Sequence, residues 1–536
     1  MKLLPFFSSF VAISLLSPIG FEAGAVKAFP GLLTYEQPDG EKIPIRMVGC
    51  RGNYRFCNPD GLPLKLNPDG YYVVAEDASF IVEGLAPENQ MRERRRGPGQ
   101  VETSYPTLGE QRALVILVEF ADNEFSMPDP HDFYHRMLNE EGFSDNNGTG
   151  SARDYFIANS QGKFIPSFDV YGPVKLSGDI AYYGKNNQWK EDSNPQEMTI
   201  EACRLLDDQI DFTQYDRDGD GVIDNVFVYY AGYGEHDGGG SNTIWPHSTK
   251  LSLVYHQKFL FDGVELERYA CSNELQSKMR SGKPDGIGTF CHEFGHVLGL
   301  PDLYSTSFIN LETPGDWDLM DNGNYNNEGN TPANLSAFER YALDWMEPIP
   351  LDYGEYTLNA IGEANEAYMY VCPNPNEYFL FENRQQQGFD AYLPGHGMLV
   401  WRINYNKTIW DNNVVNNSFM YQYVEIMEAD DQPGGGTRPG DTFPGSNNKT
   451  EFSRYTTPAF KGKTQADIPY ALININESED GVITFEVADP SSSSVATVGE
   501  GAPAGDCYYD LTGRKIDGKS LPKGVYIHNG RKEIRK

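Results

Sequence analysis

Residues 291–304 read CHEFGHVLGLPDLY, the most informative segment of the 536-residue chain. Apolar residues recur at helical spacing between Gly286 and Gly299, which predicts a helix there; they are Ile287, Phe290, Phe294, Val297 and Leu298. His292 and His296 stand four positions apart, so they share one helix face and can bind one zinc ion through imidazole nitrogens. Glu293 is placed to act as general base and then as proton donor.

The residues after this helix extend the metal-binding pattern. Gly299 stands where the helix must end or turn sharply, and glycine adopts a left-handed φ at little cost. Asp302 occupies the position at which the pattern H-E-x-x-H-x-x-G-x-x-H carries its third ligand, and a carboxylate can bind zinc there. A helix with two ordinary histidines would have no reason to keep this register. The sequence therefore predicts a zinc site made by His292, His296 and Asp302.

Weaker signals flank this motif. Residues 315–321 form a tight turn that contains Met320, and it fits a Met-turn beneath the zinc. Tyr325 follows and could donate a hydrogen bond to the oxyanion of the reaction. His247, in the segment IWPHS, is either a further contact of the metal region or a hydrogen-bonded structural residue.

A second metal-binding pattern lies at residues 216–225, which read DRDGDGVIDN. The candidate ligands fall in register with an EF-hand-like loop, and they are Asp216, Asp218, Asp220, the carbonyl of Val222, and Asp224. Gly221 stands where such a loop turns sharply. The loop's last position is Phe227 and not Glu, so another residue or water must complete the shell. We expect a structural calcium ion here, and the alternative is an acidic, solvated turn.

Charge and the N-terminal residues indicate where the protein acts. The formal net charge is -34, and such a surface repels phosphate backbones and anionic lipid headgroups, which argues against nucleic-acid and membrane-surface roles. Residues 1–25 read as a signal peptide, with an apolar run and the cleavage site Ala23-Gly24-Ala25. No later stretch approaches the ~20 apolar residues that a membrane helix needs. We expect an exported protein without membrane insertion.

The remaining pattern predicts an α+β protein of several parts. Residues 26–100 read as short strands that end near the basic run Arg94-Arg95-Arg96, which is either a linker or the cleavage junction of a propeptide. Residues 101–350 hold the buried strand ALVILVEF and the zinc helix, and we assign them to the catalytic domain. Short alternating strands predict an antiparallel β domain at 351–490, then a flexible linker at 491–506 and a small basic tail at 507–536.

The seven cysteines include no C-x-x-C pair, so a thiolate zinc site is not predicted. Cys50 and Cys57 are close enough in sequence for a local disulfide, which the sequence leaves open. If they do not pair, a Cys50 thiolate is one way in which the N-terminal segment could block a zinc site. An acidic side chain or simple steric blockage is another.

With these motifs in hand, the chain resembles the immune inhibitor A family of metallopeptidases. The segments that carry the resemblance are DGYYVVAEDA, ALVILVEF, YDRDGDGVIDNVFVYYAG, GTFCHEFGHVLGLPDLY, GDWDLMDNG, SAFERYALDWM and ENRQQQGFDAYLPGHGMLVW. The chain departs from the family pattern at Ser305-Thr306-Ser307, where acidic residues are common. The tail, with DLTGRKI and LPKGVYI, resembles a shortened type IX secretion sorting domain.

The resemblance implies a metzincin-like catalytic domain with zinc held by His292, His296 and Asp302, and with Glu293 as catalyst. It also implies an extracellular endopeptidase that acts on proteins or peptides and is made as a zymogen. The tail implies contact with secretion machinery and delivery across an outer membrane. Two alternatives remain: a zinc amidase or other hydrolase acting on a non-peptide bond, and an inactive surface adhesin. The intact Glu293 favours an enzyme over the adhesin.

Overall fold

A computed structural model gives the structure of the chain. It describes residues 32–50, 53–59, 62–75, 105–185, 192–237, 242–276, 282–304, 313–416, 418, 421–432, 438–463, 468–490, 508–509, 515–516, 523–528 and 531–535. The proposed signal peptide, the basic run at Arg94–Arg96, the Ser305–Ser307 segment and the linker at 491–506 lie outside these ranges. Among the described helices, none combines the length and the apolar character needed to cross a membrane.

A five-stranded mixed sheet forms the centre of the region from 105 to 350, in the order β10-β13-β9-β6-β7. The strands are β6 (Gly109–Glu119), β7 (Phe164–Lys175), β9 (Val226–Tyr233), β10 (His247–Lys250) and β13 (Arg268–Leu275). The pairs β6–β7, β6–β9 and β9–β13 are parallel. The edge strand β10 runs antiparallel to β13, so the direction changes at this edge.

Strand β6 is buried on both faces because helices cover both sides of the sheet. Val115 and Leu117 point into one core with α2 (Pro130–Asn139), α3 (Ala152–Ser160) and α6 (Ile287–Val297). Leu114 and Ile116 point into a second core with α5 (Pro195–Leu206). The continuous apolar run ALVILVEF is typical of such a doubly covered strand. This layering places α6, which carries His292 and His296, directly against the sheet.

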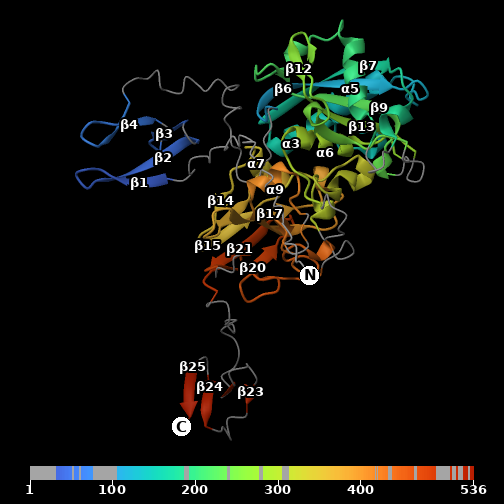
Figure 1. The fold of residues 1–536 in the computed structure, drawn as a ribbon. Helices are drawn as coiled ribbons and strands as arrows, with labels where there is room; N and C mark the ends of the chain where they lie inside the picture. The colour runs from blue at the N-terminus through green and yellow to red at the C-terminus, as the bar shows by residue number, and fades with distance from the viewer. Residues whose placement is uncertain are drawn as a thin grey trace, which may run out of the picture.

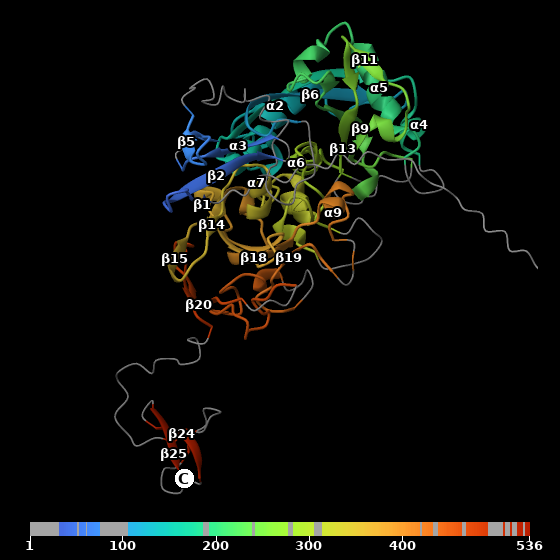
Figure 2. The same ribbon diagram turned by 60° about the vertical axis from the view of Figure 1, so that its left-hand side comes forward.

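Two further sheets follow, built almost entirely from antiparallel pairs. One has the order β14-β16-β17-β18-β19 and contains β14 (Ile349–Pro350), β16 (Tyr368–Val371), β17 (Glu377–Arg384), β18 (Gly397–Asn404) and β19 (Val424–Ile426). The other pairs β15 (Gly354–Leu358), β21 (Ile483–Ala488) and β20 (Ala471–Glu477). Only β14, at the expected domain boundary, pairs in parallel, with β16. In both ribbon views α6 and α7 (Ala337–Ala342) lie between the central sheet and the sheet of β17 and β18 (Figure 1; Figure 2).

The core of the catalytic region does not stop at residue 350. On β18, Leu399 and Trp401 join the same buried cluster as Phe290 and Phe294 of α6. The alternate residues Met398 and Val400 face a separate cluster on the other side of their sheet. The strands after residue 350 therefore share one hydrophobic core with the metal helix.

The N-terminal region forms its own antiparallel sheet of β1 (Leu32–Glu36), β2 (Lys42–Cys50), β3 (Asn53–Cys57), β4 (Pro63–Leu66) and β5 (Tyr72–Val74). The β2–β3 register pairs Cys50 with Asn53 and Cys57 with Arg46. Four residues of strand, roughly 13 Å, therefore separate the two cysteines along the hairpin. This separation argues against the local disulfide, because Cα atoms more than about 7 Å apart cannot be bridged.

The C-terminal tail contains a small antiparallel sheet of β22 (Tyr508–Tyr509), β23 (Lys515–Ile516), β24 (Gly524–His528) and β25 (Arg531–Arg535).

Candidate metal centre

Helix α6 can lie close to its neighbours because two of its positions are glycine. A Cβ at Gly288 would come within 1.9 Å of the Asn324 carbonyl oxygen, and a Cβ at Gly295 within 2.6 Å of Met320 Sδ. Met320 is fully buried, so the residue predicted for the Met-turn packs directly under the helix. The glycines thus let the helix rest on the turn at residues 315–321.

The chain reverses immediately after α6. Gly299 has a φ of +97°, a left-handed conformation that side-chain-bearing residues rarely adopt. The amide of Leu300 donates to the carbonyl of Gly295, and the amide of Leu303 donates to the carbonyl of Met320. This reversal brings Asp302 back toward the face of α6 that carries the two histidines.

Three side chains converge at this point. The Nε2 atoms of His292 and His296 each lie 3.2 Å from Asp302 Oδ1. The ligand atoms of all three residues fall within 4.8 Å of one another. Two imidazole nitrogens and one carboxylate oxygen are a ligand set that zinc takes in catalytic sites.

Backbone carbonyls orient both imidazole rings. His292 Nδ1 lies 2.9 Å from the Leu319 carbonyl oxygen, and His296 Nδ1 lies 2.8 Å from that of Leu300. A carbonyl oxygen only accepts, so each Nδ1 donates. In the neutral ring, the Nε2 lone pair then points toward Asp302. Asp302 Oδ1 is buried and has no hydrogen-bond donor among the described residues, as a metal ligand requires.

Asn413 holds the carboxylate in place from a distant part of the chain. Its Nδ2 donates to Asp302 Oδ2 at 2.6 Å, and the Asp302 amide donates to its Oδ1 at 2.7 Å. Asn413 follows α9 (Lys407–Asp411) and adopts a φ of +52°. This clamp leaves Oδ1 as the carboxylate oxygen that faces the histidines.

The electrostatics of the three side chains are those of a site that binds a cation. Burial favours the neutral imidazole, but the Asp302 carboxylate outweighs it and raises the pKa of His296 to about 9. Burial likewise disfavours ionised Asp302, yet the two histidines hold the pKa of its carboxyl well below the usual range. Positive charge on the two histidines therefore stabilises the negative charge of Asp302.

Glu293 sits beside these residues with an oxygen that is not engaged. Its side chain is buried, and its Oε2 has no hydrogen-bond partner among the described residues. Burial raises the pKa of its carboxyl, although the two histidines oppose that shift. A carboxylate with a raised pKa and a vacant oxygen is suited to accept and return a proton.

Two tyrosines lie near this centre. Tyr304 stacks against His292, with ring centroids 6.3 Å apart, and it is half-exposed. Burial and the charge of Asp302 raise the pKa of its hydroxyl. Tyr325 lies in the segment Asn322–Gly329, is also half-exposed, and stacks on His236 at 6.2 Å. Tyr325 contributes to the raised pKa of Tyr304, so the two phenols are neighbours.

His247 belongs to the edge of the sheet and not to the ligand set. Its Nδ1 lies 2.6 Å from the Trp245 carbonyl oxygen, and its Nε2 lies 2.6 Å from the Tyr269 hydroxyl. Of the two interpretations of this histidine, the structure supports the hydrogen-bonded structural one.

The acidic loop at residues 216–224 is compact. Carboxylate oxygens of Asp216, Asp218 and Asp220 lie within 4.8 Å of one another. Asp224 is not part of that cluster, and its Oδ2 accepts from the Arg217 amide at 3.1 Å. Its other oxygen is buried with no hydrogen-bond partner among the described residues, and burial raises the pKa of this carboxyl. Val222 opens the short strand β8 (Val222–Ile223), which pairs with β12 (Val264–Leu266).

Sequence reasoning did not assign roles to Asn413 or Tyr304. Tyr304 ends the motif segment itself, two residues after Asp302, so its position was a usable signal. Asn413 lies 111 residues from the carboxylate that it clamps, and no local pattern indicates it.

Comparison with known proteins agrees with this geometry. Residues 104–348 match the family described as "Immune inhibitor A peptidase M6, catalytic domain". The chain is 25% identical over 315 residues to the "Pre-pro-metalloprotease PrtV" of Vibrio cholerae serotype O1, a match that covers 50% of this chain and 34% of that protein. It is also 25% identical over 290 residues to "Immune inhibitor A" of Bacillus thuringiensis subsp. alesti, covering 46% and 42% of the two chains.

The matches thus span less than half the length of either relative. The family match, over residues 104–348, includes the segment that carries His292, Glu293, His296 and Asp302. The chain therefore contains a region, residues 104–348, that matches the catalytic domain of the immune inhibitor A family of metallopeptidases.

Proposed function

We propose that this protein is a secreted zinc-dependent endopeptidase that hydrolyses peptide bonds in proteins. The observation that carries the proposal is the convergence of His292 Nε2, His296 Nε2 and Asp302 Oδ1 beside the vacant Oε2 of Glu293. The name of the Vibrio relative, a metalloprotease, supports the same reaction class.

His292, His296 and Asp302 would hold the zinc ion. When bound, zinc would supply Lewis acidity, which polarises a peptide carbonyl and lowers the pKa of water. Glu293 would take a proton from the attacking water at its vacant oxygen and pass it to the leaving amine. The Leu319 and Leu300 carbonyls would keep each imidazole in one tautomer throughout.

We assign the role of oxyanion donor to Tyr325, because it is exposed next to the site and carries a hydroxyl. Tyr304 is the competing candidate, since its ring lies against His292. Removing each hydroxyl as Tyr325→Phe and Tyr304→Phe separates the two. The donor's variant should lose kcat at nearly unchanged KM, by about 10²-fold.

The function is tested by measuring zinc in the purified protein and cleavage of a denatured protein substrate by the same sample. We expect one zinc per chain, cleavage inside the substrate chain, and loss of both on treatment with a zinc chelator. Zinc without cleavage of any protein, but with hydrolysis of simple amides, would favour the amidase alternative. An inert zinc protein would favour an adhesin.

We further propose that the loop at residues 216–224 binds a structural calcium ion. Its support is the cluster of Asp216, Asp218 and Asp220 together with the unsatisfied buried oxygen of Asp224. Binding to the folded state alone would raise the melting temperature as calcium is added. Asp218→Asn should abolish that calcium dependence and leave the zinc content unchanged. A melting temperature that does not change with calcium concentration would contradict the proposed calcium site.

Finally, we propose that the region before residue 101 is a propeptide that keeps the enzyme latent, and that the tail engages secretion machinery. The supports are the separate β1–β5 sheet, the basic run at Arg94–Arg96 and the prefix "Pre-pro" in the name of the Vibrio relative. On one peptide substrate, the intact precursor should be much less active than the precursor cut at the basic run. Equal activity would contradict latency.

A further inference from the structure

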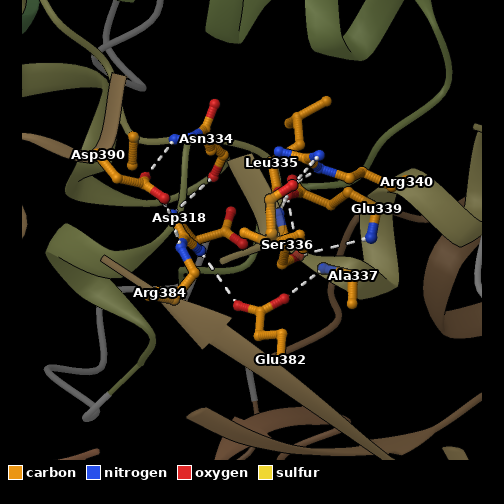
Figure 3. Close-up of polar contacts among 12 residues, drawn as sticks. Asp318, Asn334, Leu335, Ser336, Ala337, Glu339, Arg340, Glu382, Arg384 and Asp390 are labelled. Atoms are coloured by element: carbon orange, nitrogen blue, oxygen red, sulfur yellow. Dashed lines mark hydrogen bonds and ion pairs between the residues drawn. The ribbon is translucent and has the colours of Figure 1, made fainter. Parts of the chain in front are cut away.

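A group of buried acids and bases lies where α7 meets strand β17 (Figure 3). None of these acidic and basic residues is more than 2% exposed. Its acidic members are Asp318, Glu339, Glu382 and Asp390, and its basic members are Arg340 and Arg384. The four acids outnumber the two bases in a space without water contact, so the charges cannot all be balanced if every acid is ionised.

Arg384 neutralises two of the acids directly. Its Nη1 lies 3.1 Å from Glu382 Oε1, and its Nη2 and Nε donate to the two oxygens of Asp390 at 2.6 and 2.9 Å. Arg340 donates instead to neutral acceptors, which are the carbonyls of Leu335 and Ile361 and the side-chain oxygens of Asn159 and Asn365. Asp318 and Glu339 are therefore left without a direct ion-pair partner in this group.

Each of these two acids has one satisfied oxygen and one that is not. Asp318 Oδ1 accepts from the Met320 amide at 2.8 Å, and Glu339 Oε2 accepts from the Ser336 amide and hydroxyl at 2.7 and 2.9 Å. The remaining oxygens, Asp318 Oδ2 and Glu339 Oε1, are buried and receive no donor from the described residues. Each of the two carboxyl groups affects the pKa of the other, so the two groups are neighbours. Two ionised carboxylates have no hydrogen to share, so a hydrogen bond between their unsatisfied oxygens would require a proton.

We propose that Asp318 and Glu339 share one proton, and that this carboxyl–carboxylate hydrogen bond positions the turn beneath the metal centre. The two residues are positioning residues and touch no substrate. The consequence for catalysis rests on the proposed peptidase function, whereas the shared proton itself does not.

The turn transmits the position of Asp318 to the metal ligands. Asp318 Oδ1 fixes the Met320 amide, and the Sδ atom of Met320 lies under Gly295 of α6. Leu319, between them, supplies the carbonyl that receives the His292 Nδ1 proton. A shift of Asp318 would thus move both Met320, on which α6 packs, and the Leu319 carbonyl, which orients His292.

The electrostatics of the surroundings support a retained proton. Burial raises the pKa of both carboxyls. Asp321 adds to that rise at Asp318, and Asp318 adds to the rise at Glu339, whereas Glu339 opposes the rise at Asp318. Arg384 opposes the rise at Asp318. The other charged or titratable side chains nearby are Arg340, Glu382, Asp390 and Tyr155.

The sign of the resulting pH dependence follows from linkage. A folded-state pKa above the unfolded value means that the folded protein holds a proton which the unfolded chain releases. The stabilisation is fully present at a pH below the unfolded-state pKa values, near 3.8 for Asp318 and 4.5 for Glu339. It is lost as the pH rises through their raised folded-state pKa values. Stability attributable to this pair should therefore fall as the solution becomes alkaline.

Amide substitutions test the proton specifically, because an amide carries a permanent hydrogen. In Glu339→Gln, the amide oxygen can accept from Ser336 while the NH₂ group donates to Asp318 Oδ2. In Asp318→Asn, the amide oxygen can accept from Met320 while the NH₂ group donates to Glu339. In the double variant the two NH₂ groups face each other, and turning either amide over leaves another donor without an acceptor. Melting temperature and zinc content are measured for the four proteins from pH 6 to pH 9.

We expect each single variant to bind zinc and to keep kcat/KM within about threefold of the wild-type value at neutral pH. As the pH rises, each should lose less stability than wild type. The alkaline limb of its kcat/KM profile should move up by about one pH unit or more. The double variant should lose more stability than the sum of the single effects. Additive effects, or an alkaline slope that persists in both single variants, would overturn the proposal.

A spectroscopic measurement keeps the proposal testable even if a variant fails to fold. The wild-type protein at neutral pH should show the infrared carbonyl stretch of a protonated carboxylic acid, and the band should disappear at alkaline pH together with the loss of stability. Absence of that band at neutral pH would overturn the proposal. Because melting and infrared spectra do not depend on turnover, a failure of the proposed peptidase function would remain distinguishable.

Discussion

The Asp302 carboxylate can serve as a metal ligand only if one of its oxygens stays aimed at the histidines, and Asn413 provides that constraint with two hydrogen bonds. Removing it as Asn413→Ala should weaken zinc binding by about 10- to 100-fold, the usual effect of losing an outer partner of a ligand. Affinity is measured by competition with a chelator. The matched control is Asn412→Ala, because Asn412 is exposed and, among the residues that the structure describes, its side chain bonds only to the Thr408 carbonyl. Equal affinities in the two variants would show that the clamp is dispensable.

The candidate ligands could be predicted from the sequence because they are closely spaced in it. The groups that orient them could not, because they lie far away in the chain. His292 and His296 share a helix face because they stand four residues apart. Gly299 allows the turn that brings Asp302 back to that face. Asn413 and the carbonyl of Leu319 act through the fold alone. The sequence left His247 open between a contact of the metal region and a structural residue, and its hydrogen bond to Tyr269 at the sheet edge supports the structural role.

Helix α6 offers a prediction about its two closest contacts. Gly288→Ala would press a methyl group against the Asn324 backbone, whereas Gly295→Ala would press one against the Met320 thioether, which can rotate away. Gly288→Ala should therefore lower stability by about 3 kcal/mol or more, and Gly295→Ala by about 1 to 3 kcal/mol. Denaturant unfolding of the zinc-loaded variants gives both values. The reverse order would mean that the turn beneath α6 is more rigid than the backbone beside it.

Elements with a strong apolar pattern were predictable, and their pairing was not. The run ALVILVEF predicts a buried strand, and β6 is covered on both faces. The β2–β3 register, which separates Cys50 from Cys57, depends on which residues form the turn between the strands. Two cysteines seven positions apart carry no information about that choice.

At the scale of the whole molecule, the strands after residue 350 complete the core that holds α6. Tyr378, Leu380 and Trp401 are fully buried in the same cluster as Phe294. Each such side chain contributes about 1.5–3 kcal/mol, and a domain is stable by only about 5–15 kcal/mol. A chain of residues 101–350 should therefore fail to fold cooperatively, whereas residues 101–490 should fold. Thermal melting followed by circular dichroism distinguishes them, and a cooperative transition in the shorter chain would contradict the shared core.

Sequence periodicity placed a boundary near residue 350 because the strand pattern changes there. It could not show that β18 is buried on both faces, with Trp401 toward α6 and Val400 toward the other core. Strand β17 of the same sheet places Arg384 and Glu382 in the buried group that includes Asp318 and Glu339 (Figure 3). The catalytic region and the following strands are thus one packed body.

The central claim is that Glu293 is the proton-transfer group of a zinc peptidase and not a ligand. The most direct measurement compares wild type with Glu293→Gln for zinc content and for cleavage of one peptide substrate. Because Glu293 lies beside the three ligand atoms without contributing one, the variant should keep its zinc while its rate falls by about 10²–10⁴-fold or more. Undiminished cleavage, or loss of zinc in parallel with activity, would contradict this assignment.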